Sequence, residues 1–413
     1  MNQTTPITVG GQRATAKAAL DGARSRAASL YIHVPFCFHK CHYCDFYSFV
    51  DSRDRQEAFV RALETELGAI APAATSLESI FVGGGTPSLL RPDLWERLLA
   101  TIHRHFDCSA TPEFTVECNP ETVTEELAAV LAGGGVNRAS VGAQSFDERQ
   151  LKALERWHDP ANVERSLSIL RDAGIHRRSV DLIFGIPGQT LRDWVCDLET
   201  ALGLLDGQGI EHLSAYALTY EPGTAMTKKL ELGRLNAIDE DLETEMQMLT
   251  WSMLEQRGFS RYEVSNFAKP GAECRHNLAY WRQHEWLAAG PSASGHSNGW
   301  RWKNIPRLTD WINSVNATGG WCSVTDLEPP DPLRALAERI MTGLRLREGL
   351  AYDRLLADAE AIGAAQTLGQ EIRRHADRGD LVVHDGQLVL NEQGWLFADG
   401  IASSLMQSLD PTG

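Results

Sequence analysis

The sequence lacks several features that would set it apart from ordinary globular proteins. It has no apolar run of about 18 residues, the length that a membrane-spanning helix needs. Basic residues number 39 against 55 acidic ones, and a net charge of −16 argues against a protein that holds nucleic acid through a basic surface. The first residues lack the apolar core of a secretory signal peptide. We therefore expect a cytoplasmic protein with no membrane span and no nucleic-acid partner.

Cysteine is also scarce, with eight residues in 413. A disulfide-stabilised domain would be shorter and would carry a denser, regular pattern of cysteines. Five of the eight are isolated, whereas Cys37, Cys41 and Cys44 fall within one short segment. In a reducing compartment, such a group indicates metal binding.

Apolar segments alternate with amphipathic ones through the first two thirds of the chain. The amphipathic segments, such as 56–70 and 92–105, have apolar residues at helical spacing. Strand-like segments precede them at 29–36, 79–83, 113–118, 138–143, 180–185 and 212–219. Six strands that alternate with helices predict an α/β fold of parallel units with right-handed crossovers. Periodicity alone leaves an open sheet and a partial barrel as alternatives.

The length exceeds what one hydrophobic core usually supports, so a second, smaller domain is expected. We expect a disordered tail over 1–27, with a transit peptide as the alternative, and the main α/β domain over 28–260. An aromatic-rich region follows over 261–330, and a C-terminal domain over 331–413. There, two helical segments precede a hairpin signal at His384-Asp385-Gly386. This pattern favours a helical, winged-helix-like domain, or a C-terminal cap on the main domain.

The clustered cysteines have the spacing CxxxCxxC directly after the first predicted strand. A structural zinc site needs four ligands, and no second cysteine pair follows, although nearby histidines keep zinc open as an alternative. A [4Fe-4S] cluster bound by three cysteines instead leaves one iron open to an outside ligand. The amino and carboxylate groups of S-adenosylmethionine (SAM) can chelate that iron. The spacing therefore favours a SAM-binding [4Fe-4S] cluster.

Polar and glycine residues recur at or near the ends of the predicted strands. The second strand runs into Gly83-Gly84-Gly85-Thr86, whose backbone can approach a ligand closely. Glu117 and Gln144 end the next two strands. Asp181 begins the strand after those, and in a barrel of such units the chemistry gathers at the carboxyl ends of the strands.

These motifs together resemble the coproporphyrinogen III oxidase-like family of radical SAM proteins, over residues 29–405. The resemblance implies a partial (β/α)6 radical-SAM barrel followed by a smaller C-terminal domain. It implies that Cys37, Cys41 and Cys44 bind the [4Fe-4S] cluster. It assigns to the SAM site and its surroundings Tyr31, Tyr43, Gly84, Gly85, Thr86, Glu117, Gln144, Arg156, Asp181 and Ala215.

The family has an oxidase branch and a heme-chaperone branch. The oxidases carry a fourth cysteine two residues after the third, where this chain has Phe46, and a longer N-terminal extension. The segment from His276 to Trp281 resembles the HNxxYW signature of the heme chaperones. The family's glycine-rich loop after this signature is altered here, because Ser292 stands where a second glycine is usual.

The signature implies heme as a further cofactor, with His276 as a possible ligand of the heme iron and Tyr280 and Trp281 as flat apolar surface. The structural alternative is a buried, hydrogen-bonded His276. Cys274, two residues earlier, is interpreted as a small buried side chain rather than a heme or redox ligand.

The resemblance to the heme chaperones implies a carrier that delivers heme to heme-requiring client enzymes, membrane-bound respiratory enzymes among them, and that receives electrons from a donor. It also implies a cytoplasmic location, with peripheral attachment at the inner membrane face as a further option. The alternatives are an oxygen-independent coproporphyrinogen III oxidase and another radical reaction on a tetrapyrrole.

Overall fold

The computed structural model describes residues 7–9, 12–21 and 27–410, which fold into two compact units. The first, here called the barrel unit, comprises the chain up to residue 260 together with 267–276 and 285–328. The second, the C-terminal unit, comprises 261–266, 277–284 and residues from 329 onward. Helix α10 (Arg275–Trp281) begins in the first unit and ends in the second.

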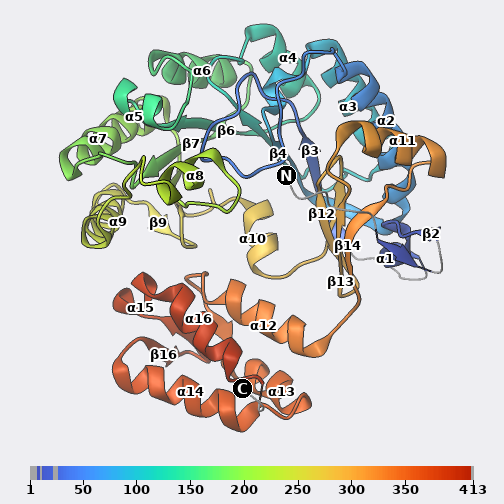
Figure 1. Cartoon of the computed structure of the whole chain (residues 1–413). Coiled ribbons are helices and arrows are strands. Elements are labelled where there is room, and N and C mark those ends of the chain that lie inside the picture. The colour runs from blue at the N-terminus through green and yellow to red at the C-terminus, as the bar shows by residue number, and fades with distance from the viewer. Residues whose placement is uncertain (1–6, 10–11, 22–26, 411–413) are drawn as a thin grey trace. The chain divides into compact units, whose positions relative to one another are not determined.

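Six parallel strands in sequence order form the centre of the barrel unit (Figure 1). They are β3 (Ala27–Val34), β4 (Ala74–Gly84), β5 (Glu113–Cys118), β6 (Arg138–Gln144), β7 (Arg177–Phe184) and β8 (His212–Ala217). The sheet does not close on itself. Strand β11 (Trp286–Ala289) pairs with the outer edge of β3, and β10 (Asn266–Ala268) and β9 (Ser260–Arg261) follow β8. The α/β fold is thereby confirmed, as a partial rather than a closed barrel.

Helices connect successive strands and cover the outside of the sheet (Figure 1). Helix α2 buries Phe59, Leu63 and Leu67, the face that its apolar spacing predicts. Helix α7 begins at a capping box of Thr190 and Asp193. The helices are α2 (Gln56–Ile70), α3 (Pro92–His105), α4 (Glu125–Gly133), α5 (Glu148–Ala153), α6 (Ala161–Asp172), α7 (Leu191–Gln208), α8 (Ala225–Glu231) and α9 (Glu240–Glu255), with short 3-10 turns η1 (Ala71–Ala73) and η2 (Pro87–Leu89).

Most of the region expected as an aromatic-rich segment between the domains belongs to the barrel unit. Strands β12 (Ser294–Ser297), β13 (Trp300–Asn304) and β14 (Val324–Glu328) extend the sheet beyond β11 in antiparallel fashion, and α11 (Leu308–Thr318) lies between the last two. Trp302 and Trp311 are buried. Their burial explains why this region belongs to the barrel unit and is not a separate segment, because large aromatic side chains stabilise added strands as readily as they form a ligand site.

The expected disordered tail over 1–27 needs correction in the residues that are described. Two short strands, β1 (Thr8–Val9) and β2 (Gln12–Arg13), precede the one-turn helix α1 (Lys17–Leu20), in which Leu20 is buried. Backbone N–H groups of Ile7 and Val324 donate to the carbonyl oxygens of Val324 and Ala14, respectively, at 3.1 Å each. These hydrogen bonds hold the segment along β14, which no local sequence pattern indicates.

The C-terminal unit combines helices with a three-stranded antiparallel sheet of order β15-β17-β16. Its hairpin turns at Asp385 and Gly386, whose φ angles of 49° and 76° suit a type I′ turn, as the sequence predicts. The elements are α12 (Pro332–Gly343), β15 (Leu350–Ala351), α13 (Tyr352–Ala361), α14 (Ala365–Arg378), β16 (Leu381–His384), β17 (Gln387–Leu390), α15 (Glu392–Leu396) and α16 (Ala398–Gln407).

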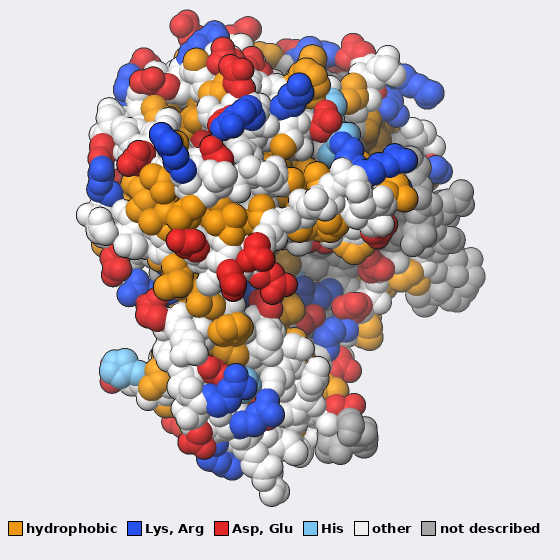
Figure 2. All heavy atoms as spheres, turned by 60° about the vertical axis from the view of Figure 1, so that its left-hand side comes forward, with side chains coloured by type: hydrophobic (Ala, Val, Ile, Leu, Met, Phe, Trp, Pro, Cys, Tyr) orange, Lys and Arg blue, Asp and Glu red, His pale blue; other side chains and the backbone are white. Residues whose placement is uncertain are grey.

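The described part of the chain contains no helix with the length and apolarity needed to cross a bilayer. Figure 2 shows acidic and basic side chains interspersed over the visible face of the barrel unit. On that face, the excess of acidic residues is therefore not gathered into one patch.

Candidate functional site

The three clustered cysteines lie in a loop that leaves the carboxyl end of β3. Backbone hydrogen bonds close the loop, from Cys37 N to the carbonyl of Phe49 and from Phe49 N to the carbonyl of Pro35, both at 3.0 Å. Cys37, Cys41 and Cys44 all line one cavity of about 350 Å³. The loop therefore places the three cysteines on the wall of one cavity.

Two polar groups from other elements reach these sulfur atoms. The hydroxyl of Thr86 donates to Cys37 Sγ at 3.6 Å, and Nη1 of Arg156 donates to Cys41 Sγ at 3.8 Å. The Nε atom of Arg156 is buried without a hydrogen-bond partner. Arg156 thus holds a guanidinium charge beside thiols that would be thiolates when bound to iron, an arrangement that suits an iron–sulfur cluster.

Helix α8 contacts the cysteine loop at His42. The backbone N–H of Met226 donates to the carbonyl of His42 at 2.9 Å, and Nζ of Lys229 lies 3.0 Å from Nδ1 of His42. Oε1 of Glu155 lies 3.6 Å from the same Nδ1 atom. Because His42 lies between Cys41 and Cys44, these contacts restrain the backbone that carries the thiols.

Among the described residues, no three His, Cys, Asp or Glu side chains gather closely enough to hold a single metal ion. A [4Fe-4S] cluster makes a different demand, because each cysteine binds a different iron of the cube. The fit of this loop to a cluster therefore depends on the shared cavity and its donor set rather than on convergence at one point.

A second cavity, of about 480 Å³, adjoins the cysteines at the carboxyl ends of the strands. Most of the residues predicted for the SAM site line it, namely Tyr43, Gly84, Gly85, Thr86, Glu117, Gln144, Arg156 and Asp181. Cys44 and Phe46 line it as well, and the Phe46 side chain is 58% exposed. The tertiary structure thus gathers these residues, from the cysteine loop and four strands, around one space.

The glycine run forms one wall of this cavity. Gly84 has a φ of 107°, and a side chain there would collide with the His33 ring. A side chain at Gly85 would meet the backbone of Pro35 and Phe36. The N–H of Gly84 donates to Oε2 of Glu117 at 3.0 Å. Only glycine fits this close approach to neighbouring groups of the protein, and the approach of this backbone to a ligand stays a prediction.

Two half-buried carboxyl groups, those of Glu117 and Asp181, face the cavity. Burial, and then the charge of Asp181, raise the pKa of Glu117 to about 7. Burial also raises the pKa of Asp181, although the hydroxyls of Ser140, Ser179 and Ser214 donate to its carboxylate. Carboxyl groups with shifted pKa values that line a cavity are typical of a binding site.

Backbone strain occurs at the same edge. Gln144 ends β6 with a φ of 64°, in the left-handed region that non-glycine residues rarely adopt, and the pairing of β6 with β7 shifts register there. Ser292 also has a positive φ, 66°, at the position where the family usually has glycine. Both residues keep the strained conformation despite their side chains.

Three predicted residues lie outside the two cavities. Ala215 is buried within β8, and its neighbours Tyr216 and Ala217 line the 480 Å³ cavity instead. Tyr31 lies within β3, where its hydroxyl is 3.1 Å from Nδ1 of His33. Burial, and then the charge of Glu117, raise the pKa of Tyr31.

His276 differs most from the prediction. Its side chain is fully buried, with Nδ1 2.8 Å from the hydroxyl of Ser79. The residue lies beside Ser79, midway along β4, and Glu113, at the amino end of β5. The expectation that His276 binds heme iron is therefore corrected for this conformation, because no ligand can reach the imidazole. Cys274 is likewise buried, and its thiol donates to Glu113 at 3.4 Å.

Sequence reasoning missed the aromatic rim of the cysteine cavity. Phe38 and Trp157 line this cavity, and their side chains are 75% and 64% exposed. The ring of His39 contacts Trp157 edge-on, at 5.8 Å between centroids. Single aromatic residues usually belong to a core, so only the exposure of these side chains reveals the rim.

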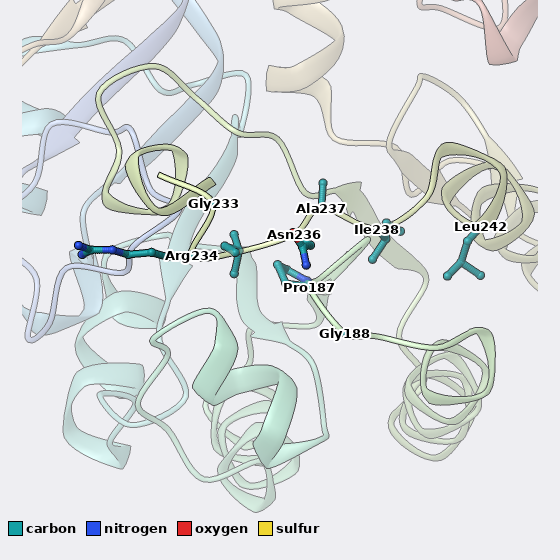
Figure 3. Close-up of a pocket in the computed structure, with 9 residues that line it drawn as sticks. Pro187, Gly188, Gly233, Arg234, Asn236, Ala237, Ile238 and Leu242 are labelled. Atoms are coloured by element: carbon teal, nitrogen blue, oxygen red, sulfur yellow. The ribbon is translucent and has the colours of Figure 1, made fainter. Parts of the chain in front are cut away.

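Another cavity, of about 570 Å³, lies beside the loop between β7 and α7 (Figure 3). Pro187 and Gly188 form one side and residues 233–238 the other, with Leu242 of α9 at one end. In Figure 3 the side chain of Arg234 extends away from Pro187. No cysteine and no predicted site residue lines this cavity.

Comparison with known proteins agrees with this geometry. A model of the radical SAM superfamily matches residues 31–201. The chain is 35% identical to the heme chaperone HemW of Mycobacterium tuberculosis, over 91% of this chain and 94% of that protein. It is 33% identical to the heme chaperone HemW of Bacillus subtilis, over 92% and 100%. It is 30% identical to radical S-adenosyl methionine domain-containing protein 1, mitochondrial, of Danio rerio, over 93% and 88%.

The fold has a counterpart among solved structures. The coproporphyrinogen III oxidase HemN of Escherichia coli, a radical SAM enzyme, superposes with a TM-score of 0.80 over 96% of this chain and 93% of that one, at 20% identity. At this identity the match shows the fold alone. With the full-length similarity to HemW proteins, the chain belongs to the coproporphyrinogen III oxidase-like family of radical SAM proteins, in its heme chaperone HemW branch.

Proposed function

We propose that this protein binds heme and a SAM-coordinating [4Fe-4S] cluster and delivers heme to client enzymes, respiratory enzymes among them. The observation that carries the proposal is the similarity over nearly the whole chain to proteins named heme chaperone HemW. The proposed setting is cytoplasmic, with clients at the membrane and a separate electron donor.

The cluster would be bound by Cys37, Cys41 and Cys44, and SAM would occupy the adjoining 480 Å³ cavity. When bound, the cluster supplies an open iron for SAM and a route for electrons. The chain's own contribution is orientation. Glu117 fixes the amide of Gly84 in the wall of the cavity, and Arg156 holds its charge beside the cluster loop.

Heme requires flat apolar surface, and His276 does not provide an accessible ligand. The exposed rings of Phe38 and Trp157 at the cysteine cavity and of Phe46 at the neighbouring one offer such a surface. We place heme contact at this rim, so that the Phe38→Ala, Trp157→Ala double variant should bind hemin at least about tenfold more weakly, a loss of about 1.4 kcal/mol.

The oxidase alternative is supported by the HemN-like fold. Phe46 opposes it, because this residue stands where the oxidases of the resemblance carry a fourth cysteine. One experiment separates the two functions. Protein reconstituted without oxygen is titrated with hemin and, separately, given coproporphyrinogen III, SAM and a reductant.

A Soret band from bound hemin without formation of protoporphyrinogen supports the carrier. Formation of protoporphyrinogen supports the oxidase. The absence of a Soret change refutes the proposed heme binding, and ring-opened product would indicate another reaction on a tetrapyrrole.

A further inference from the structure

His276 lies inside the barrel unit, and the proposed function leaves it without a role. We propose that His276 is a positioning residue for the SAM cavity, acting through the rings of Phe81 and Tyr31, which both lie beside its imidazole. This inference rests on the proposal that SAM binds in the 480 Å³ cavity. It replaces heme ligation as the role of this part of the HNxxYW signature.

The backbone of His276 is held in place by Glu113. Oε1 of Glu113, at the amino end of β5, accepts the backbone N–H groups of Arg275 at 2.7 Å and of His276 at 3.3 Å. A carboxylate that binds the first N–H groups of a helix fixes where the helix begins. Glu113 therefore sets the position of the His276 backbone.

The imidazole is fixed as well. The hydroxyl of Ser79 donates to Ser29 at 2.8 Å, which leaves the Ser79 oxygen to accept from Nδ1 of His276, also at 2.8 Å. Burial lowers the pKa of His276 to about 3, so the ring is neutral at physiological pH. A neutral, hydrogen-bonded ring with no exposed surface is suited to packing.

The rings of Phe81 and Tyr31 both lie beside the imidazole. The centroids of His276 and Phe81 lie 5.2 Å apart, with an angle of 27° between the planes. The centroid of Tyr31 lies 6.5 Å from that of His276 and 6.3 Å from that of Phe81. Loss of the imidazole would therefore affect both rings directly, because a closely packed interior leaves no free space to absorb a displacement.

The two rings support the wall of the cavity. A side chain added at Gly83 would lie 2.9 Å from Phe81 Cε1 and 2.8 Å from Oε2 of Glu117, so Gly83 lies close to both groups. The hydroxyl of Tyr31 is 3.1 Å from Nδ1 of His33, whose ring lies against Gly84. The two rings thereby link His276 to groups that form the wall of the cavity.

Truncation of His276 would leave a cavity under Phe81 and Tyr31. The two rings could then move away from Gly83 and Glu117, and the glycine wall would lose its fixed position. SAM affinity should fall, whereas heme bound elsewhere should be unaffected.

The test uses the full chain with its cluster reconstituted. SAM binding is followed through the electron paramagnetic resonance of the reduced cluster, and hemin binding through the Soret band. The His276→Ala variant should bind SAM at least about tenfold more weakly than the wild type and bind hemin within about twofold of it. The control is Leu170→Ala, which creates a cavity at a buried position of α6, away from the three rings, and should leave SAM affinity unchanged.

The His276→Phe variant keeps a ring beside Phe81 and Tyr31 and should recover most of the SAM affinity. If His276→Ala does not fold, Phe81→Leu, nearer to the cavity, must show the same loss of SAM affinity. Unchanged SAM affinity in the variant that folds overturns the proposal, as does loss of hemin with SAM binding intact. Wild-type protein that binds SAM but not hemin would refute only the proposed carrier function, and wild-type protein that binds no SAM would refute the premise.

Discussion

Strand β5 has a glutamate near each end, and the two have opposite surroundings. Glu113, at the amino end, accepts hydrogen bonds from Cys274, Arg275 and His276 and pairs with arginines. Glu117, four residues later, accepts one backbone N–H and lines an open cavity. Within one strand, the fully bonded carboxylate stabilises the fold, and the carboxyl group with few partners is left available for a ligand.

The same contrast extends to the two ends of the barrel. On the amino-terminal side, the α10 segment from Arg275 to His276 is tied by hydrogen bonds to Ser79, midway along β4, and to Glu113, at the amino end of β5. At the carboxyl ends, glycines, a strained Gln144 and exposed aromatic rings surround cavities. Parallel α/β proteins commonly bind ligands at the carboxyl ends of their strands.

The largest expected effect is at the cysteine loop. Replacing Cys41 by alanine should abolish cluster binding, because the motif offers only three cysteine ligands and the cluster needs all of them. Iron content and absorption near 400 nm measure the outcome. Cys196→Ser, at an exposed cysteine of α7, is the control and should keep full iron content. Retention of the cluster by Cys41→Ala would contradict the assignment of the ligands.

Glu113→Gln should destabilise the barrel unit by about 3 kcal/mol or more, because it removes a buried charge from its arginine partners. Arg138 Nη1 lies 3.8 Å and Arg177 Nη1 3.4 Å from Oε2 of Glu113. Urea denaturation measures the change in the free energy of unfolding. If Glu113 and Glu117 were equivalent, Glu117→Gln would cost as much, and the comparison would fail.

The pH dependence should distinguish the two glutamates. The folded pKa of Glu117 is about 7, above its ordinary value of 4.5, so the folded state retains a proton that the unfolded state loses. Glu117 therefore contributes its full stabilisation below pH 4.5. This contribution is lost as the pH rises to about 7.

Glu117→Gln should remove this decline. The free energy of unfolding of the variant should therefore rise by about 3 kcal/mol relative to that of the wild type between pH 4.5 and 8. Urea titrations of both proteins at pH 5 and 8 measure the difference. A stability difference that does not change with pH would show that Glu117 is already ionised at pH 5.

The smallest effect is expected at the contact between α8 and the cysteine loop. Lys229 contacts His42, but its side chain is 43% exposed, and exposed ionic contacts contribute less than about 1 kcal/mol. Lys229→Met should speed the loss of iron to a chelator by about twofold to fivefold, in keeping with that energy. Lys228→Met, the exposed neighbour on the same helix, should behave as the wild type. Equal rates for both variants would remove α8 from the support of the loop.

The sequence by itself determined the local structure and the donor set of the cysteine motif. Helices α2 and α3 and strand β5 occur at the predicted residues, because their apolar spacing and flanking residues are local signals. The CxxxCxxC spacing and the glycine run are local signals as well. Neighbours in sequence bring the cysteines to one cavity, and close backbone approach requires glycine whatever surrounds it.

Only the tertiary structure decided which of the other side chains face a ligand. Nothing near His276 in the sequence indicates that Ser79 and Phe81, almost two hundred residues away, enclose it. The exposure of Phe38 and Trp157 likewise depends on what the fold leaves uncovered. Burial is a property of long-range packing, so the histidine that suggests a heme ligand in the sequence lies, in the fold, enclosed beside Phe81, and other aromatic side chains form the rim of the cysteine cavity.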